Sequence, residues 1–373
     1  MTGIYIHIPF CRSRCLYCDF YSTTLPQTWQ KSYIEAIAKE MGLRPNTAPV
    51  STIYIGGGTP SQLTPKALHQ LFKALVEHYK IDSDAEITIE ANPDDVTPEW
   101  ITALKDTPVN RISMGVQSLN DDTLKLLHRR HTARQAHEAV ARLQRADYLN
   151  LSLDLIYGLP KQTLEQFCHD VETLLNWDIP HLSAYALQYE EGTPLYALRQ
   201  EGKIKEADEE LSLACYENLM KLTAKAGMEH YEISNFARPG FRSRHNSSYW
   251  TGQPYIGLGA GAHSYDGKQL RNYNCEDIKA YIQGIERNER PSATEQLDED
   301  ARYNERVMLS LRTAEGLSLT NLERDFGKAR KEYCEHMAEP HILRGSIKKT
   351  GENICLTRRA LFVSDDIISD LMV

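Results

Sequence analysis

The chain has 373 residues, of which 41% are hydrophobic and 25% are charged, and this is the composition of an ordinary globular protein. Its formal net charge of −9 argues against a nucleic-acid-binding protein, because phosphate recognition depends on clustered lysines and arginines. No apolar run reaches the roughly 18 residues that span a bilayer, and the N-terminus lacks the features of a secretory signal. We therefore expect a cytoplasmic protein with no direct membrane insertion and no nucleic-acid partner.

The first predicted element is a short apolar strand, GIYIHI, over residues 3–8. Directly after it come Cys11, Cys15 and Cys18 in a C-x3-C-x2-C pattern. Three thiolates can hold three irons of a [4Fe–4S] cluster and leave the fourth iron free to bind a substrate or cofactor. Tyr17 places an aromatic ring beside that iron, where a flat heterocycle such as adenine can pack. The triplet therefore indicates a cluster with a nucleoside cofactor.

Two other kinds of site use similar cysteine spacings. A structural zinc site usually needs a fourth thiolate or imidazole close by, and His7 belongs to the preceding strand. Cys15 and Cys18 alone form a C-x-x-C redox pair, which normally opens a helix in a smaller domain. The cluster is the preferred interpretation. The remaining five cysteines are expected to be buried free thiols, because their spacing matches no ligand set: Cys168, Cys215, Cys275, Cys334 and Cys355.

Farther along, β-rich runs alternate with amphipathic helical stretches. This alternation predicts a curved parallel α/β sheet or barrel of six repeats, with helices outside and functional loops at the carboxyl ends of the strands. The predicted strands cover residues 3–8, 51–56, 85–91, 110–116, 150–158 and 181–187. The predicted helices cover residues 31–41, 65–79, 121–146 and 163–176.

Polar residues recur where these strands end. After the second strand, residues 56–60 (GGGTP) form a loop whose backbone can approach a ligand and donate N–H groups to a carboxylate. Glu90 ends the third strand, Gln117 follows the fourth and Asp154 lies in the fifth, and such groups can bind ribose hydroxyls or an ammonium group. Singly, each is more often a cap, turn or surface residue. Arg129 belongs to the charged run HRRH, for which a solvated face is the ordinary interpretation.

Together these segments resemble the radical S-adenosylmethionine superfamily, in the branch of the oxygen-independent coproporphyrinogen III dehydrogenase HemN and the haem chaperone HemW. The matching segments lie within residues 1–265 and are YIHIPFCRSRCLYCDF, IYIGGGTPS, ITIEANPD, RISMGVQSL, LDLIYGLPKQT, RHNSSYW and YIGLGAGAHSY. The resemblance implies a partial (β/α)6 barrel, a [4Fe–4S] cluster on the three cysteines, and S-adenosylmethionine chelating the free iron. The implied S-adenosylmethionine contacts are Tyr5, Gly57, Gly58, Thr59, Glu90, Gln117, Arg129 and Asp154, with further contacts at Gln188 and His263.

Two features distinguish the chain from the dehydrogenase of this branch. In the dehydrogenase a further cysteine follows the triplet, whereas Asp19 and Phe20 follow Cys18 here. The dehydrogenase also has an N-terminal extension that helps to enclose its substrate, whereas only ten residues precede Cys11 here. Hydrogen abstraction needs the substrate in near contact with the radical source, so the missing extension argues against that reaction. The C-D-F ending and the H-N-x-x-Y-W string over residues 245–250 look like HemW. The chain is therefore identified as a member of the HemW type.

Resemblance to HemW implies haem binding and transfer of haem to haem-requiring respiratory proteins, with a homodimer as a candidate assembly. A haem site needs an apolar surface, an axial ligand and aromatic walls, which His245, Tyr249 and Trp250 supply. We expect His245 or His263 to be the axial ligand, and the competing interpretation of His245 is a hydrogen-bonded core histidine. A radical enzyme acting on a tetrapyrrole, such as the dehydrogenase, stays open as the alternative, because the cofactor residues are intact.

The C-terminal region is expected to be a separate module. We expect residues 1–285 to form the barrel core with its HemW-type extension, 286–300 a polar linker, and 301–373 a small helical, winged-helix-like domain. Within it, residues 349–353 (KTGEN) predict a turn between two β-like runs. Winged helices often bind DNA, but the local charge is mixed. A lid or a partner-docking module near the barrel mouth is the expected role.

Overall fold

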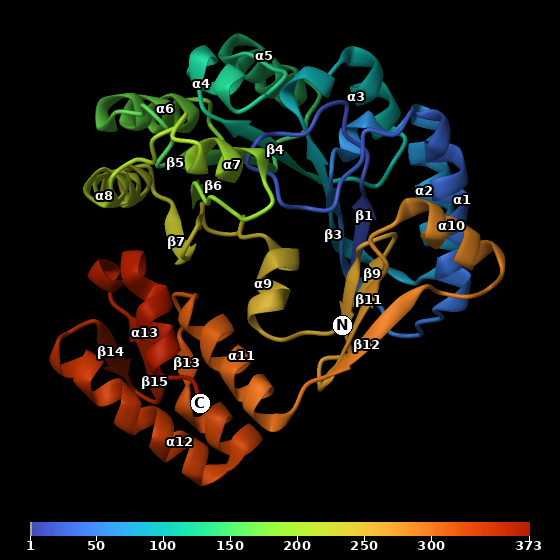
Figure 1. Cartoon of the computed structure of the whole chain (residues 1–373). Coiled ribbons are helices and arrows are strands. Elements are labelled where there is room, and N and C mark those ends of the chain that lie inside the picture. Colours follow the sequence, from blue (N-terminus) through green and yellow to red (C-terminus); the bar gives the residue numbers. More distant parts are fainter. Residues whose placement is uncertain (1) are drawn as a thin grey trace.

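The computed structural model describes residues 2–373, and its centre is a run of six parallel strands (Figure 1). The strands pair in chain order, and side chains such as Ile4, Ile6 and Ile8 are fully buried because helices cover the sheet. This arrangement confirms the predicted α/β core. The strands are β1 (Thr2–Ile8), β2 (Val50–Gly57), β3 (Ile81–Ala91), β4 (Arg111–Gln117), β5 (Leu151–Tyr157) and β6 (His181–Ala186).

Helices connect these strands and lie around the outside of the sheet (Figure 1). Threonine side chains cap the N-termini of α2, α3, α5 and α6 by accepting a backbone N–H. The stretch 121–146, predicted as one helix, divides into α4 and α5, because His128 has φ 58° and Thr132 forms a capping box with Gln135. The elements are α1 (Thr28–Leu43), η1 (Pro60–Gln62), α2 (Pro65–His78), η2 (Pro93–Asp95), α3 (Pro98–Lys105), α4 (Asp121–Leu126), α5 (Ala133–Arg145), α6 (Leu164–Asn176), α7 (Pro194–Gln200) and α8 (Glu209–Lys225).

The sheet continues beyond both edges of the parallel core. Antiparallel β8 and β7 follow β6, while β9 pairs parallel with β1 and leads to antiparallel β10, β11 and β12. Part of the segment 286–300, which was predicted as a linker, forms the edge strand β12. All side chains of β12 are exposed, so the sequence has no hydrophobic alternation that would predict a strand there. These elements are β7 (Glu229–Glu232), β8 (Asn235–Ala237), α9 (Arg244–Trp250), β9 (Tyr255–Leu258), β10 (His263–Tyr265), β11 (Leu270–Asn274), α10 (Ile278–Glu286) and β12 (Ser292–Gln296).

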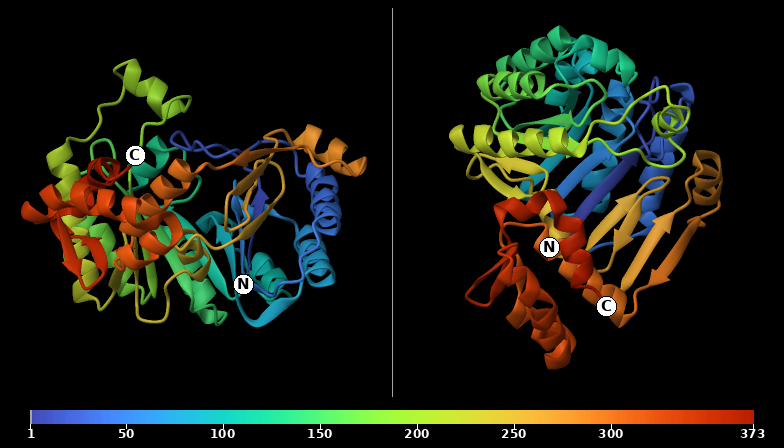
Figure 2. Two further views of the ribbon diagram at one scale, coloured as in Figure 1. Left: turned by 90° about the horizontal axis from the view of Figure 1, so that it is seen from below. Right: turned by 60° about the vertical axis from the view of Figure 1, so that its left-hand side comes forward.

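The C-terminal elements gather into a separate body beside the sheet (Figure 2). This region has its own hydrophobic core, which includes Tyr303, Val307 and Leu322. The predicted hairpin is confirmed, because β14 and β15 pair around the turn at Gly351. No helix among residues 2–373 combines the length and apolarity needed to cross a membrane. The elements are α11 (Glu299–Leu311), β13 (Leu317–Ser318), α12 (Leu319–Leu343), β14 (Ile347–Thr350), β15 (Asn353–Leu356), η3 (Arg358–Val363) and α13 (Ser364–Asp370).

A buried carboxylate holds the β9–β11 extension against the core. Glu40 of α1 is fully buried and accepts hydrogen bonds from Gly259 N (2.9 Å), Asn274 Nδ2 (2.9 Å) and Tyr281 Oη (2.6 Å). Arg44 Nη1 lies 3.7 Å from the other side of the same carboxylate. A buried charge is tolerated only when such partners replace its hydration. Glu40 therefore adds a side-chain anchor to the backbone pairing of β9 with β1.

We predict that Glu40→Ala lowers the free energy of unfolding by about 3–5 kcal/mol, because it leaves buried donors at Gly259, Asn274 and Tyr281 without their acceptor. Chemical denaturation measures the change. Glu35→Ala is the matched control, since Glu35 is half exposed on the same helix and pairs only at 3.9 Å with Lys31; its effect should stay within about 0.5 kcal/mol. Equal losses for the two variants would refute the role of Glu40.

Candidate functional site

The three predicted cluster ligands lie on one loop that follows β1. Cys11, Cys15 and Cys18 are all half-buried free thiols, and the Cys11 N–H donates to Thr23 O at 2.9 Å. Burial, with the neighbouring Cys15 and Cys11 thiols, raises the pKa of Cys18 to about 11. Among residues 2–373, no three His, Cys, Asp or Glu side chains gather tightly enough for a single metal ion. Each cysteine of a four-iron cluster binds a different iron, so such a site does not require the three sulfurs to surround one metal ion.

Two hydrogen-bond donors from other loops reach this cysteine loop. Thr59 Oγ1 donates to Cys11 Sγ at 3.4 Å, and Arg129 Nη1 donates to Cys15 Sγ at 3.4 Å. Thr59 follows β2 and Arg129 follows α4, so segments distant in sequence meet at the sulfurs. Donors to sulfur stabilise its anionic form, which is the form that binds iron.

The guanidinium of Arg129 is fixed on several sides. Its Nη2 donates to Asn92 Oδ1 (2.7 Å) and to Gly115 O (2.6 Å). Burial by itself would lower the pKa of Arg129, but the Tyr17 hydroxyl and the Cys15 thiol raise it above its usual value, so the side chain stays cationic. The surface interpretation of the HRRH run is therefore wrong at this residue. A half-buried cation beside the sulfurs offsets the negative charge that a thiolate-bound cluster brings.

The glycine loop after β2 packs closely against His7 and the cysteine loop. The expected free N–H donors are engaged inside the protein: Gly57 N donates to Glu90 Oε2 at 3.1 Å, and Gly58 N donates at 2.8 Å to the carbonyl of the last residue of β1. A Cβ at Gly57, whose φ is 110°, would lie 2.6 Å from the His7 ring. A Cβ at Gly58 would lie 3.0 Å from Cys11 Sγ. Only glycine lets this loop approach the cysteines so closely.

Two half-buried carboxyl groups, Glu90 and Asp154, lie near this loop. Glu90 accepts a hydrogen bond from Tyr54 Oη at 2.8 Å, and burial together with the nearby Asp154 carboxyl raises its pKa to about 7. Burial likewise raises the pKa of Asp154 to about 6. Carboxyl groups whose pKa lies near neutral pH can accept hydrogen bonds from hydroxyls or, when ionised, pair with an ammonium group.

The remaining predicted contacts divide into two groups. Gln117 lies beside Arg129, because Gly115 between them leaves room: a Cβ there would be 2.8 Å from Gln117 Nε2 and 3.1 Å from Arg129 Nη2. Tyr5 stacks on Tyr54, the partner of Glu90, with ring centroids 6.3 Å apart. Gln188, by contrast, is exposed after β6 and no contact connects it to the group.

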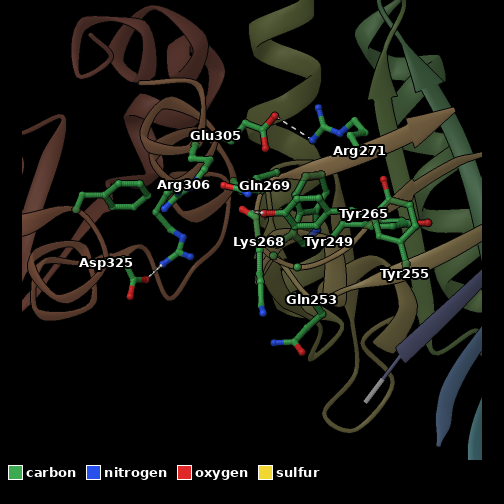
Figure 3. Close-up of a pocket in the computed structure, with 16 residues that line it drawn as sticks. Tyr249, Gln253, Tyr255, Tyr265, Lys268, Gln269, Arg271, Glu305, Arg306 and Asp325 are labelled. Carbon is green, nitrogen blue, oxygen red and sulfur yellow. Dashed lines mark hydrogen bonds and ion pairs between the residues drawn. The ribbon is translucent and has the colours of Figure 1, made fainter. Parts of the chain in front are cut away.

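Three adjoining cavities form a strip that runs from the cysteine loop to the C-terminal domain. A cavity of about 310 Å³ is lined by Tyr5, Phe20 and His263, one of about 630 Å³ by His263 and Arg271, and one of about 780 Å³ opens toward the C-terminal domain (Figure 3). Tyr255 lines all three. These volumes are within the range of small-molecule sites. The strip is the place where a large planar ligand can lie.

The structure separates the histidines proposed as haem ligands. His245 is 1% exposed, and its two ring nitrogens bond to Thr52 Oγ1 (2.9 Å) and Tyr249 Oη (2.8 Å). Burial, with Arg111 nearby, lowers its pKa to about 3. His245 thus matches the competing interpretation of a hydrogen-bonded core histidine. His263 is exposed and lines two cavities of the strip.

The aromatic lining of the strip escaped sequence reasoning. Tyr249 and Trp250, the predicted aromatic walls, do line the largest cavity. Tyr255, Tyr265 and Arg271 complete the wall, yet they were not predicted. Residues that pair directly across two strands, or lie two apart in one strand, share a face of the sheet. The alternating aromatic and polar residues within residues 255–273 could therefore have predicted a shared aromatic face.

Two protein-family models match the chain. The model described as Radical SAM superfamily matches residues 5–174, and the model described as HemN C-terminal domain matches residues 297–363. The first range covers the five parallel strands that carry the cysteine and glycine loops, and the second covers most of the C-terminal domain.

Curated relatives match nearly the whole chain. The heme chaperone HemW of Lactococcus lactis subsp. lactis (strain IL1403) is 38% identical over 325 residues, which are 87% of this chain and 85% of that protein. HemW of Bacillus subtilis (strain 168) is 34% identical over 372 residues, 98% of each chain. The solved coproporphyrinogen III oxidase HemN from Escherichia coli is 23% identical, with a TM-score of 0.86 over 100% of this chain and 90% of that one. That last likeness shows a shared fold.

The raised pKa of Glu90 predicts a pH effect on stability. The folded protein holds a proton that the unfolded chain releases above about pH 4.5, so this stabilisation is complete below pH 4.5 and is lost as the pH rises through about 7. Glu90→Gln removes the titration. From pH 5 to 8, without cluster or cofactor, the wild type should lose about 2 kcal/mol more unfolding free energy than Glu90→Gln. Urea denaturation at the two pH values measures it, with the exposed Glu77→Gln as a control that should follow the wild type.

Proposed function

The chain belongs to the HemW branch of the radical SAM superfamily, and on this premise we propose that it binds haem and transfers it to haem-requiring respiratory proteins. We further propose that it carries a [4Fe–4S] cluster and S-adenosylmethionine. The observation that supports the proposal best is the strip of aromatic cavities that begins at the cysteine loop and includes an exposed histidine. A porphyrin needs such a wall and such a ligand close together.

Cys11, Cys15 and Cys18 would hold the cluster. The fit is supported by three half-buried thiols on one loop and by the two donors that reach them, Thr59 and Arg129. A cluster held there supplies one-electron chemistry and one iron open to the cofactor. The protein's contribution is to shield the sulfurs from water and to balance their charge with the guanidinium.

The side chains around the cysteine loop suit S-adenosylmethionine. Glu90 and Asp154, when ionised, attract the cofactor's ammonium group and accept hydrogen bonds from ribose hydroxyls, while Gln117 and Arg129 offer donors beside them. Tyr5 and the half-buried ring of Tyr17 offer flat surfaces for the adenine. Gln188 is exposed and so has the weakest claim to a contact.

His263 is our candidate for the axial haem ligand. It is exposed on β10, and its ring stacks against Tyr273 with centroids 5.6 Å apart. Partial desolvation of the ring and the nearby Arg271 lower its pKa, which favours the neutral imidazole that binds iron. Tyr249 and Trp250 would pack against the porphyrin from α9. His245 then acts indirectly, because its hydrogen bond to the Tyr249 hydroxyl orients the Tyr249 ring.

The cluster assignment predicts that replacing Cys11, Cys15 or Cys18 by alanine reduces iron in anaerobically reconstituted protein from about four atoms per chain to nearly none. The broad visible absorption of the cluster should disappear with it. Cys168→Ala is the control, because Cys168 is also half-buried but lies on α6, and it should keep full iron. Wild-type protein that bound no iron and sulfide would refute the assignment.

The haem assignment predicts that His263→Ala weakens haem binding at least about tenfold and shifts the Soret band, because the iron loses its protein ligand. His169→Ala, an exposed histidine on α6, should bind haem like the wild type. Haem-loaded wild-type protein should also deliver haem to an apo respiratory haem protein, measured by the acceptor's spectrum. Failure of the wild type to bind or deliver haem would overturn the proposed function.

A tetrapyrrole oxidoreductase is the second candidate function. The observation that favours it is the intact pair of half-buried carboxyl groups, Glu90 and Asp154, next to the cluster loop and Arg129. A protein that only carries haem has no evident need for them. Reconstituted protein, reductant and S-adenosylmethionine incubated with coproporphyrinogen III would decide: formation of protoporphyrinogen IX would establish the enzyme.

A further inference from the structure

The largest cavity of the strip lies between the sheet extension and the C-terminal domain. Figure 3 shows its two sides: Tyr255, Tyr265 and Arg271 come from strands β9–β11, whereas Glu305 and Arg306 come from α11. It has a volume of about 780 Å³. Because both domains line it, neither domain forms this cavity alone.

One side of the cavity is aromatic and flat. In the antiparallel extension, Tyr255 pairs with Tyr265, which in turn pairs with Arg271, so the three side chains share one face of the sheet. His263 is two residues from Tyr265 on the same strand and therefore points to that face as well. The ligand surface thus continues from the candidate axial histidine to Arg271.

The opposite end of the cavity is rich in positive charge. Arg271 Nη2 lies 2.9 Å from Glu305 Oε1, and Arg306 Nη1 lies 2.8 Å from Asp325 Oδ2, with all four side chains about a quarter to a third exposed. Arg302 lies over the Phe326 ring at 5.6 Å. With Lys268, four cationic side chains and two carboxylates line the cavity, an excess of two positive charges in a chain whose net charge is −9. A flat ligand that carries two negative charges fits this surplus.

We propose that this basic end of the cavity binds the carboxylate groups of a tetrapyrrole, through Arg271 and Arg306. This inference rests on the proposed haem function and adds to it the recognition of the ligand's acidic side chains. Guanidinium groups can bind carboxylates bidentately, and each of these arginines already pairs with a carboxylate through one nitrogen. The ligand's carboxylates take the place of Glu305 and Asp325, so these two acidic residues compete with the ligand.

The test compares haem with haem dimethyl ester, whose carboxylates are masked, by Soret titration of the full-length protein. The wild type should bind haem at least about tenfold more tightly than the ester. Arg271→Gln and Arg306→Gln should each weaken haem binding about tenfold and leave ester binding unchanged. Arg287→Gln is the control, since this exposed arginine pairs with Glu289 outside the cavity, and it should change neither.

Glu305→Gln separates recognition from domain docking, because it removes the competing charge from the same contact. Under the proposal it raises haem affinity, since Arg271 is freed for the ligand. If the Arg271–Glu305 pair only held the domains together, Glu305→Gln and Arg271→Gln would both weaken haem and ester binding alike, and the proposal would be overturned. Equal wild-type affinity for haem and ester would also overturn it while leaving haem binding intact. A wild type that binds no haem would instead refute the proposed function itself.

Discussion

The position of strand β1 is the constraint on which the site depends. Its parallel register with β2 sets Ile8 opposite Gly57, so the cysteine loop and the glycine loop leave the sheet side by side. On its other edge β1 pairs with β9, with Gly3 opposite Tyr255, and one cavity is lined both by Tyr255 and by Phe20, which follows the cysteines. Backbone hydrogen bonds of a single strand therefore join the candidate cluster site to the candidate haem surface.

Half-buried charge is concentrated around that junction. Arg129, Glu90 and Asp154 are each half-buried, and partial loss of water is costly for a charged group unless neighbouring groups compensate it. Arg129 is compensated by carbonyl and amide oxygens and by a sulfur, whereas the two carboxyl groups are compensated by keeping a proton up to near-neutral pH. Such partly compensated groups are typical of sites that await a charged ligand. A cationic cofactor and an anionic cluster would supply the missing countercharges.

The C-terminal domain completes a ligand surface and at the same time closes it. Arg271 belongs to the sheet extension and Glu305 to α11, so their ion pair joins the two domains across the largest cavity. Arg312 adds a second contact by lying over the Trp250 ring at 5.5 Å. The interface also has an apolar part, because Phe362 of the C-terminal domain packs against the main core, with its ring centroid 6.2 Å from that of Tyr216. Access of a porphyrin to the strip therefore depends on the position of the C-terminal domain.

The sequence by itself determined the cysteine spacing, the glycine loop and the alternation of strands and helices, because these are local patterns written in neighbouring residues. From them the α/β core and the loop that carries the three cysteines were predictable. Only the tertiary structure decided that Arg129 is half-buried against a sulfur, that His245 has both ring nitrogens engaged while His263 is exposed, and that residues 292–296 form an edge strand. The physical reason is that Arg129 meets Cys15 across 114 positions and His245 meets Thr52 across 193, and only tertiary packing brings such partners together. Strand β12 depends on backbone hydrogen bonds to β11, which leave no trace in the side-chain pattern.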